Sequence, residues 1–199
     1  MDQETDQQSV LDTLMSPAVS MTADATIAII AEEGFDRVSV RSVAAGTVQY
    51  RSPSRRTLLT DALIRSVQRQ AGRVVSHEVA PAQPETFVRA LAELLPTGTV
   101  QREDAAAWVA FGAAASTRPW LADPYWEALQ TMRTWVEGVL ADARKAGRMR
   151  ADLTPAEGAR LVTAIVNGLT LDLLNAPPTE SDEVIGQLRS GLGLILRGL

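Results

Sequence analysis

The stretch GFDRVSVRSVAAGTVQYRSPSRRTLLTDAL, residues 34–63, carries the most informative structural signals in this 199-residue chain. It begins at Gly34, which ends a helix predicted from about Thr22 by apolar residues at helical spacing. A second, short helix is expected to begin at Ser39 and to end by Gly46, because the apolar residues between them fall on one stripe. The stretch therefore predicts two closely connected helices near the N-terminus.

The sequence outside this stretch also has helical periodicity. A long amphipathic helix is predicted over residues 55–78, with Arg65, Arg69 and Arg73 on its outer face. PAQPE, residues 81–85, interrupts the pattern, so we expect a domain boundary there. No strand-like alternation occurs between turn residues, and the predicted fold class is all-α. Further helices are expected at about 84–95, 102–116, 122–146, 154–175 and 180–197, separated by Pro96-Thr97-Gly98, Pro119 with Asp123-Pro124, Ala146-Gly147 and Pro177-Pro178.

The charges are unevenly distributed along the chain, whose formal net charge is -5. Residues 1–34 hold seven acidic residues and no basic residue, whereas residues 35–75 hold eight arginines against two aspartates. Residues 76–199 are acidic again, with eleven basic and fifteen acidic residues. A concentrated basic segment is typical of an element that faces nucleic-acid phosphates. A solvated, arginine-rich helix face is the alternative interpretation.

Composition argues against most catalytic chemistry. The chain has no Cys and a single His, His77, which excludes a disulfide framework and most zinc or nucleophilic sites. We therefore expect no catalytic residue, metal or cofactor, and a protein that is not an enzyme. No apolar run is long enough for a membrane span, and the acidic N-terminus lacks a secretory signal, so a cytoplasmic location is expected.

The 34–63 stretch resembles the helix-turn-helix of the TetR family of transcriptional regulators. The motifs are Gly-Phe-Asp-Arg-Val-Ser-Val-Arg-Ser-Val-Ala-Ala (34–45), Gly-Thr-Val-Gln-Tyr (46–50) and a Ser- and Arg-rich start of a Leu-Leu helix (51–63). The resemblance implies a small N-terminal DNA-binding region and a C-terminal helical bundle for ligand sensing and dimerisation. The expected domains are a mobile acidic arm (1–20), the DNA-binding region with its bridging helix (21–80) and the ligand-binding and dimerisation domain (81–199).

The resemblance also implies a set of DNA contacts. Residues at the start of the second helix would face the phosphate backbone, residues of the recognition helix would read base edges, and arginines of the next helix would add salt-sensitive attraction. The implied DNA-binding residues are Ser39, Arg41, Thr47, Gln49, Tyr50, Arg51, Arg55 and Arg56.

The sequence departs from the family where DNA would be read. The segment around Ala45-Gly46 and Tyr50-Arg51 is about eight residues shorter than the family pattern, and a recognition helix limited to residues 46–50 is costly to nucleate alone. Either the sequence lacks residues that the protein has, or the protein itself has lost them. Two functions stay open accordingly: a ligand-responsive repressor released by a small-molecule effector, or a TetR-like dimer with a degenerate DNA-binding region that binds ligands or proteins.

Two further groups are predicted in the C-terminal half. Clustered aromatic residues are suited to line an effector pocket, although an ordinary core is the alternative. Apolar stripes on the last two helices are suited to a two-fold dimer interface, with intramolecular core again the alternative. TPAE, residues 154–157, has the order of a helix-capping box. The predicted pocket comprises Trp108, Phe111, Trp120, Trp126, Met132 and Trp135, and the predicted interface comprises Leu161, Ile165, Leu169, Leu188, Leu192 and Ile195.

Overall fold

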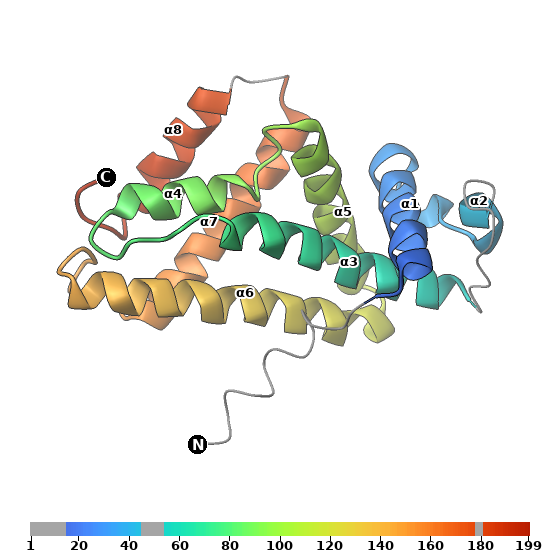
Figure 1. The fold of residues 1–199 in the computed structure, drawn as a ribbon, viewed down its shortest axis with the longest axis horizontal. Helices are drawn as coiled ribbons and strands as arrows, with labels where there is room; N and C mark the ends of the chain where they lie inside the picture. Colours follow the sequence, from blue (N-terminus) through green and yellow to red (C-terminus); the bar gives the residue numbers. More distant parts are fainter. Residues whose placement is uncertain (1–14, 45–53, 178–180) are drawn as a thin grey trace, which may run out of the picture. The chain divides into compact units, whose positions relative to one another are not determined.

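The computed structural model describes residues 15–44, 54–177 and 181–199 (Figure 1). Its helices form where the sequence provides apolar stripes between capping residues. Within these ranges there is no strand, and Met149 and Leu196 form an isolated antiparallel bridge. The all-α prediction is confirmed. The elements are α1 (Pro17–Glu33), the 3-10 turn η1 (Phe35–Arg37), α2 (Val40–Ala44), α3 (Arg55–Val75), α4 (Pro84–Ala92), α5 (Thr99–Ala115), α6 (Pro119–Lys145), α7 (Pro155–Asn175) and α8 (Ser181–Leu192).

The first helix starts earlier than the sequence predicted. Ser16 is its N-cap and accepts a hydrogen bond from the Val19 amide, and Pro17 occupies the first helical position, where no amide proton is needed. Residues 17–20, assigned above to the acidic arm, are thus the first turn of α1. Thr22, near which the helix was predicted to begin, is a buried residue inside it. Gly34 ends α1 as predicted, with its amide bonded to the Ile30 carbonyl.

Two other predicted boundaries can be compared directly. Thr154 and Glu157 form the expected capping box at the start of α7, each side chain bonding the other's backbone amide. The separator predicted around Asp123-Pro124 is wrong, because Pro119 starts α6 and Pro124 lies inside it. The helix continues past Pro124 because Leu121 and Ala128 are buried on either side of it.

The chain divides into two compact units. The N-terminal unit comprises residues 1–69 and 106–128, and the C-terminal unit comprises residues 70–105 and 129–199. This division differs from the boundary expected at 81–85, because residues from the middle of the sequence join the N-terminal unit.

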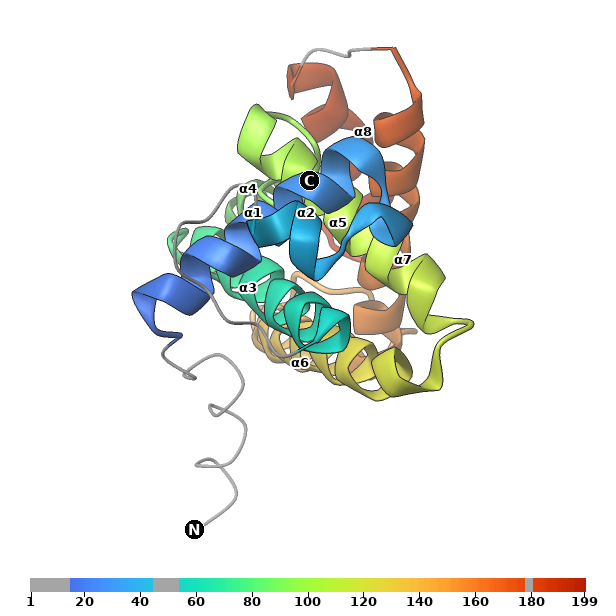
Figure 2. The same ribbon diagram turned by 90° about the vertical axis from the view of Figure 1, so that its right-hand side faces the viewer.

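Each unit has its own apolar core. In the N-terminal unit α1 packs against η1 and α2, which lie side by side in both views (Figures 1 and 2). In the C-terminal unit α8 packs against α4 and α7. The largest fully buried side chains are Ile27, Leu58, Leu59, Leu63, Phe111 and Leu121 in the N-terminal unit, and Phe87, Leu91, Leu95, Leu140, Leu188 and Leu192 in the C-terminal unit.

Candidate nucleic-acid interface

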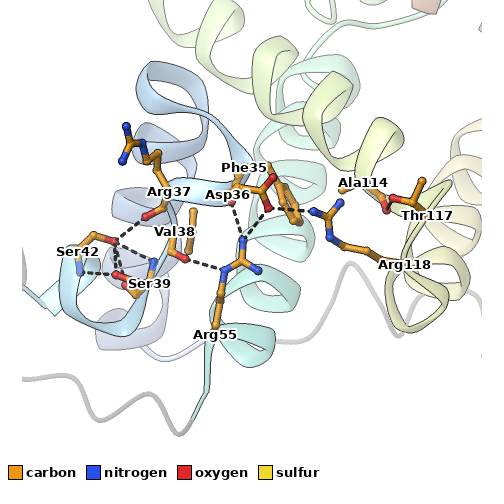
Figure 3. Close-up of polar contacts among 10 residues, drawn as sticks. All are labelled: Phe35, Asp36, Arg37, Val38, Ser39, Ser42, Arg55, Ala114, Thr117 and Arg118. Atoms are coloured by element: carbon orange, nitrogen blue, oxygen red, sulfur yellow. Dashed lines mark hydrogen bonds and ion pairs between the residues drawn. The ribbon is translucent and has the colours of Figure 1, made fainter.

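The start of α2 is fixed by two serines. The Ser42 amide donates to Ser39 Oγ at 3.0 Å, and the Ser39 amide donates to Ser42 Oγ at 2.9 Å. Ser42 Oγ also donates to the Arg37 carbonyl at 3.3 Å, so that the helix start is tied to η1 (Figure 3). These bonds satisfy amide groups that a helix start otherwise leaves open, which allows a helix of this length to form.

Ser39 was predicted to face the DNA backbone, and the structure gives its hydroxyl a capping role. The residue is exposed, but its Oγ already accepts the Ser42 amide and contacts Ser42 Oγ at 3.1 Å. Arg41, in the first turn of α2, is also exposed. Arg37, which was not among the predicted contacts, is exposed on the adjoining η1. Within the described residues neither arginine forms an ion pair, so both present a cation to solvent beside the capped helix.

Arg55, which was predicted to attract phosphates, forms hydrogen bonds within the N-terminal unit. Its Nε donates to the Val38 carbonyl at 2.7 Å, and its Nη2 donates to the Phe35 carbonyl at 3.0 Å and to Asp36 Oδ1 at 3.3 Å. The guanidinium carbon also lies 5.6 Å from the centre of the Phe35 ring. Arg55 therefore links the start of α3 to η1 (Figure 3).

Arg118 reaches the same turn from the connection between α5 and α6. Its Nη2 donates to Asp36 Oδ1 at 2.9 Å, and its guanidinium carbon lies 4.9 Å from the centre of the Phe35 ring. Figure 3 shows Arg55 and Arg118 converging on Asp36. Phe35 is itself buried and meets Phe111 edge-on at 5.6 Å between ring centroids. Sequence spacing gave no signal for this cluster, since 82 residues separate Arg118 from Asp36.

The arginines predicted on the outer face of the long helix are neutralised instead. Arg65 binds both carboxylate oxygens of Asp24, at 2.9 and 3.0 Å, and Arg69 binds the same carboxylate at 3.2 Å. Arg73 pairs at 2.8 Å with Asp104, whose side chain is 1% exposed. The prediction that these three side chains are exposed is therefore wrong. Ion pairs to acids distant in sequence hold them within each unit, and the exposed positive charge of the basic segment is correspondingly smaller.

The remaining predicted DNA contacts have mixed outcomes. Arg56 is exposed, and its guanidinium carbon lies 5.3 Å from the centre of the Trp120 ring. Thr47, Gln49, Tyr50 and Arg51 lie outside the described residues, as do the two positions where the sequence is short.

The predicted pocket residues belong to both units. Trp108 stacks on Tyr125, with ring centroids 4.5 Å apart, in the N-terminal unit, and Phe111 is fully buried there. Trp120 and Trp126 are in the same unit, and Trp126 is 53% exposed. Met132 and Trp135 pack against the core of the C-terminal unit, where Trp135 contacts Phe87. The effector pocket remains a prediction.

The predicted dimer residues also fall into two groups. Leu188, Leu192 and Ile195 are fully buried in the chain's own core, which agrees with the intramolecular alternative. On α7, Leu161 is 44% exposed, and Ile165 and Leu169 are half-buried. Leu171, which was not predicted, is 49% exposed on the same helix.

The described residues contain no group of three or more His, Cys, Asp or Glu side chains arranged to hold a metal ion. The single histidine, His77, lies 3.1 Å from Glu93 through Nε2. No helix in the described part of the chain has the length and apolar character needed to cross a membrane.

Comparisons with known proteins agree with this architecture. Residues 83–197 match the family model of the BetI-type transcriptional repressor C-terminal domain. No curated protein sequence matches the chain. Among solved structures, a transcriptional regulator from Rhodococcus sp. Rha1 is 27% identical, with a TM-score of 0.77, over 91% of this chain and 98% of that one.

Two other structures are similarly close. A protein of Saccharomonospora viridis, described as a transcriptional regulator and solved in complex with choline, is 26% identical, with a TM-score of 0.78, over 92% of this chain and all of that one. A TetR-family protein from Rhodococcus sp. is 21% identical, with a TM-score of 0.79 and the same coverage, and it supports the fold.

An all-helical chain with these relatives has the architecture of the DNA-binding transcriptional regulators. The chain belongs to the TetR family, and its C-terminal part is of the BetI type. Members of this family bind operator DNA and small-molecule effectors and act as dimers, and they are generally not enzymes.

Proposed function

We propose that the chain is a homodimeric repressor that binds operator DNA through η1 and α2 and leaves the DNA when a small-molecule effector binds. One observation supports the DNA-binding surface most directly. The start of α2 is held by the reciprocal Ser39 and Ser42 bonds, while Arg37 and Arg41 stay exposed beside it. Because the backbone beside these cations is already ordered, phosphate binding adds no cost for ordering it. The repressor assignment is supported by the BetI-type repressor family model.

The base-reading residues of this proposal follow the family resemblance. Thr47 and Gln49 would contact base edges, and Tyr50 and Arg51 would reach phosphates. Arg56, exposed at the start of α3, would add attraction to the backbone, whereas Arg55 would act by holding η1.

For the dimer, we propose that the partner packs on the exposed face of α7. Leu161, Ala164, Gly168 and Leu171 are all exposed and recur every three or four residues, so they form one stripe along the helix. Small residues between the leucines let a second helix approach closely. Burying two half-exposed leucines from each protomer removes apolar surface from water, which favours association. Ile165 and Leu169 would border this interface.

For the effector, we propose a small organic cation of the quaternary ammonium class. The 26%-identical relative from Saccharomonospora viridis was solved with choline. Aromatic faces attract such cations, and the N-terminal unit carries the predicted pocket residues Trp108, Trp120 and Trp126 on α5 and α6.

An electrophoretic mobility shift with duplex DNA from upstream of the protein's own gene tests this function. We expect salt-sensitive binding with two protomers per duplex, and release of the DNA by choline. Persistence of the complex at saturating choline would contradict the proposed effector class and leave the DNA-binding assignment standing. Absence of salt-sensitive binding would contradict the repressor.

Absence of salt-sensitive DNA binding would favour the alternative function, a TetR-like dimer that binds ligands or proteins without reading DNA. The observation in its favour is the short segment between Ala45 and Arg51, which leaves few residues for a recognition helix.

A further inference from the structure

Arg118 makes two contacts that join distant parts of the N-terminal unit. It lies in the turn between α5 and α6, directly before Pro119, and its backbone carbonyl accepts the Leu121 amide at 2.9 Å. Its side chain binds Asp36 Oδ1 and covers one face of the Phe35 ring (Figure 3). Both partners belong to η1, which ends two residues before the Ser39 cap of α2.

Asp36 is the shared point of this arrangement. The same oxygen, Oδ1, accepts from Arg118 at 2.9 Å and from Arg55 at 3.3 Å. Through Arg55 the carboxylate is joined to the start of α3, and through Arg118 to the turn between α5 and α6. The orientation of η1, and with it the direction in which the chain enters α2, is therefore held by two contacts, one from Arg55 and one from Arg118.

The exposure of these groups decides what the Arg118 contact can contribute. The Asp36 side chain is 78% exposed and the Arg118 side chain 30% exposed. Exposed ion pairs contribute little to global stability, typically about 0–1 kcal/mol. Phe35, by contrast, is 8% exposed and is held by the core through Phe111. The ion pair therefore matters for the orientation of η1 more than for the stability of the fold.

We propose that Arg118 is a positioning residue for DNA binding, which holds η1 and thereby the exposed start of α2 without touching the DNA. The proposal rests on the DNA-binding function proposed above. It assigns to Asp36 an unusual effect, because an acid beside a DNA-binding surface would by charge alone weaken binding. Under this proposal, removing the Asp36 carboxylate weakens DNA binding, because Arg118 loses the ion pair through which it holds η1.

Fluorescence anisotropy with the upstream duplex at several salt concentrations tests the proposal. The variants are Arg118→Ala, Asp36→Asn and the double variant. We expect each single change to lower the affinity by about tenfold, the double change to lower it no further, and the slope of log K against log salt to stay unchanged. Arg150→Ala is the matched control, since it removes an exposed arginine paired with Asp152 in the C-terminal unit and should leave the affinity unchanged.

Three results would overturn the proposal. Tighter binding by Asp36→Asn would show that the carboxylate acts by charge alone. A fall in the salt slope of about 0.9 in Arg118→Ala would make Arg118 a direct phosphate contact. Unchanged affinity in both single variants, with thermal unfolding showing an intact fold, would remove any role in positioning.

Hydrogen exchange of the free protein gives a readout that needs no DNA. The amides of residues 35–44 should exchange faster in Arg118→Ala than in the wild type or in Arg150→Ala, because η1 and α2 are less firmly held. If the wild type binds no duplex, the proposed function fails. Hydrogen exchange still tests whether Arg118 holds η1 and α2 in place. Unchanged exchange would contradict the positioning role whatever the DNA result.

Discussion

At the scale of single residues, arginines of one basic segment have three different environments. Arg37 and Arg41 are exposed, Arg55 binds backbone carbonyls of η1, and Arg65 is paired with Asp24. A count of charges along the sequence cannot separate these cases, because each depends on which acid or carbonyl the fold brings near. The surface that can attract phosphates is therefore smaller than the sequence charge indicates.

Arg55→Lys should destabilise the protein even though it keeps the charge. A lysine ammonium cannot reproduce the planar fork that binds the Val38 and Phe35 carbonyls together. With the side chain 39% exposed, we expect a loss of about 1–2 kcal/mol in the free energy of unfolding. Urea unfolding measures it. The neighbouring Arg56→Lys is the control and should change stability by less than about 0.5 kcal/mol; equal effects of the two changes would contradict the assigned role of Arg55.

Asp61 should make stability depend on pH. Burial raises the pKa of its carboxyl above the ordinary value of 3.8. The folded protein then keeps this proton to a higher pH than the unfolded chain, so the free energy of unfolding falls as pH rises through the two pKa values and levels off above the folded one. The free energy of unfolding of Asp61→Asn, relative to that of the wild type, should therefore increase as pH rises through this window. A gain that shrinks as pH rises would refute this account.

At the scale of elements, replacing glycine by alanine should have opposite effects on stability at two positions. Gly34 has φ 96 and ψ 162, a region open almost only to glycine, and it lies in open space. Gly34→Ala should therefore cost about 1–3 kcal/mol through the backbone alone. Gly72 lies inside α3, with nothing near its missing side chain, so Gly72→Ala should add up to about 1 kcal/mol. Thermal unfolding of both variants compares them directly, and shifts of the same sign would contradict the prediction.

Helix positions could largely be predicted from sequence because their signals are local. The Thr154 capping box and the Gly34 stop involve residues at most four positions apart, and the structure confirms both. The structure differs from the prediction at two prolines: Pro17 begins α1 although residues 1–20 were assigned to the acidic arm, and Pro124 lies inside α6 although it was assigned to a separator. The first is at a position that needs no amide proton, and buried neighbours carry the helix past the second.

The contacts that shape the candidate site could not be predicted in this way. Asp24 and Arg65 are 41 residues apart, and Asp36 and Arg118 are 82 apart. Such pairs are set by how helices pack, and the spacing of residues along one helix carries no signal for them. The resemblance indicated the TetR family, which the comparisons show, but the sequence could not show which arginines of the basic segment are held inside the unit.

At the scale of the whole molecule, the proposed dimer depends on the exposed face of α7. Leu171→Glu should convert the dimer to a monomer, because it places a charge on one of the two leucines of the apolar stripe, which the interface would bury. Sedimentation velocity measures the change. Val75→Glu is the control, since Val75 is 66% exposed outside this face and its replacement should leave the dimer intact. A dimer that survives Leu171→Glu at micromolar concentration would place the interface elsewhere.

The proposed function requires that the serine-capped start of α2 presents cations to phosphates, and the salt dependence of DNA binding measures this contribution. Log K for the upstream duplex should fall linearly with log salt, and Arg41→Ala should reduce the slope by about 0.9, the value of one lost phosphate contact. Binding that does not respond to salt, or a slope unchanged in Arg41→Ala, would contradict the claim.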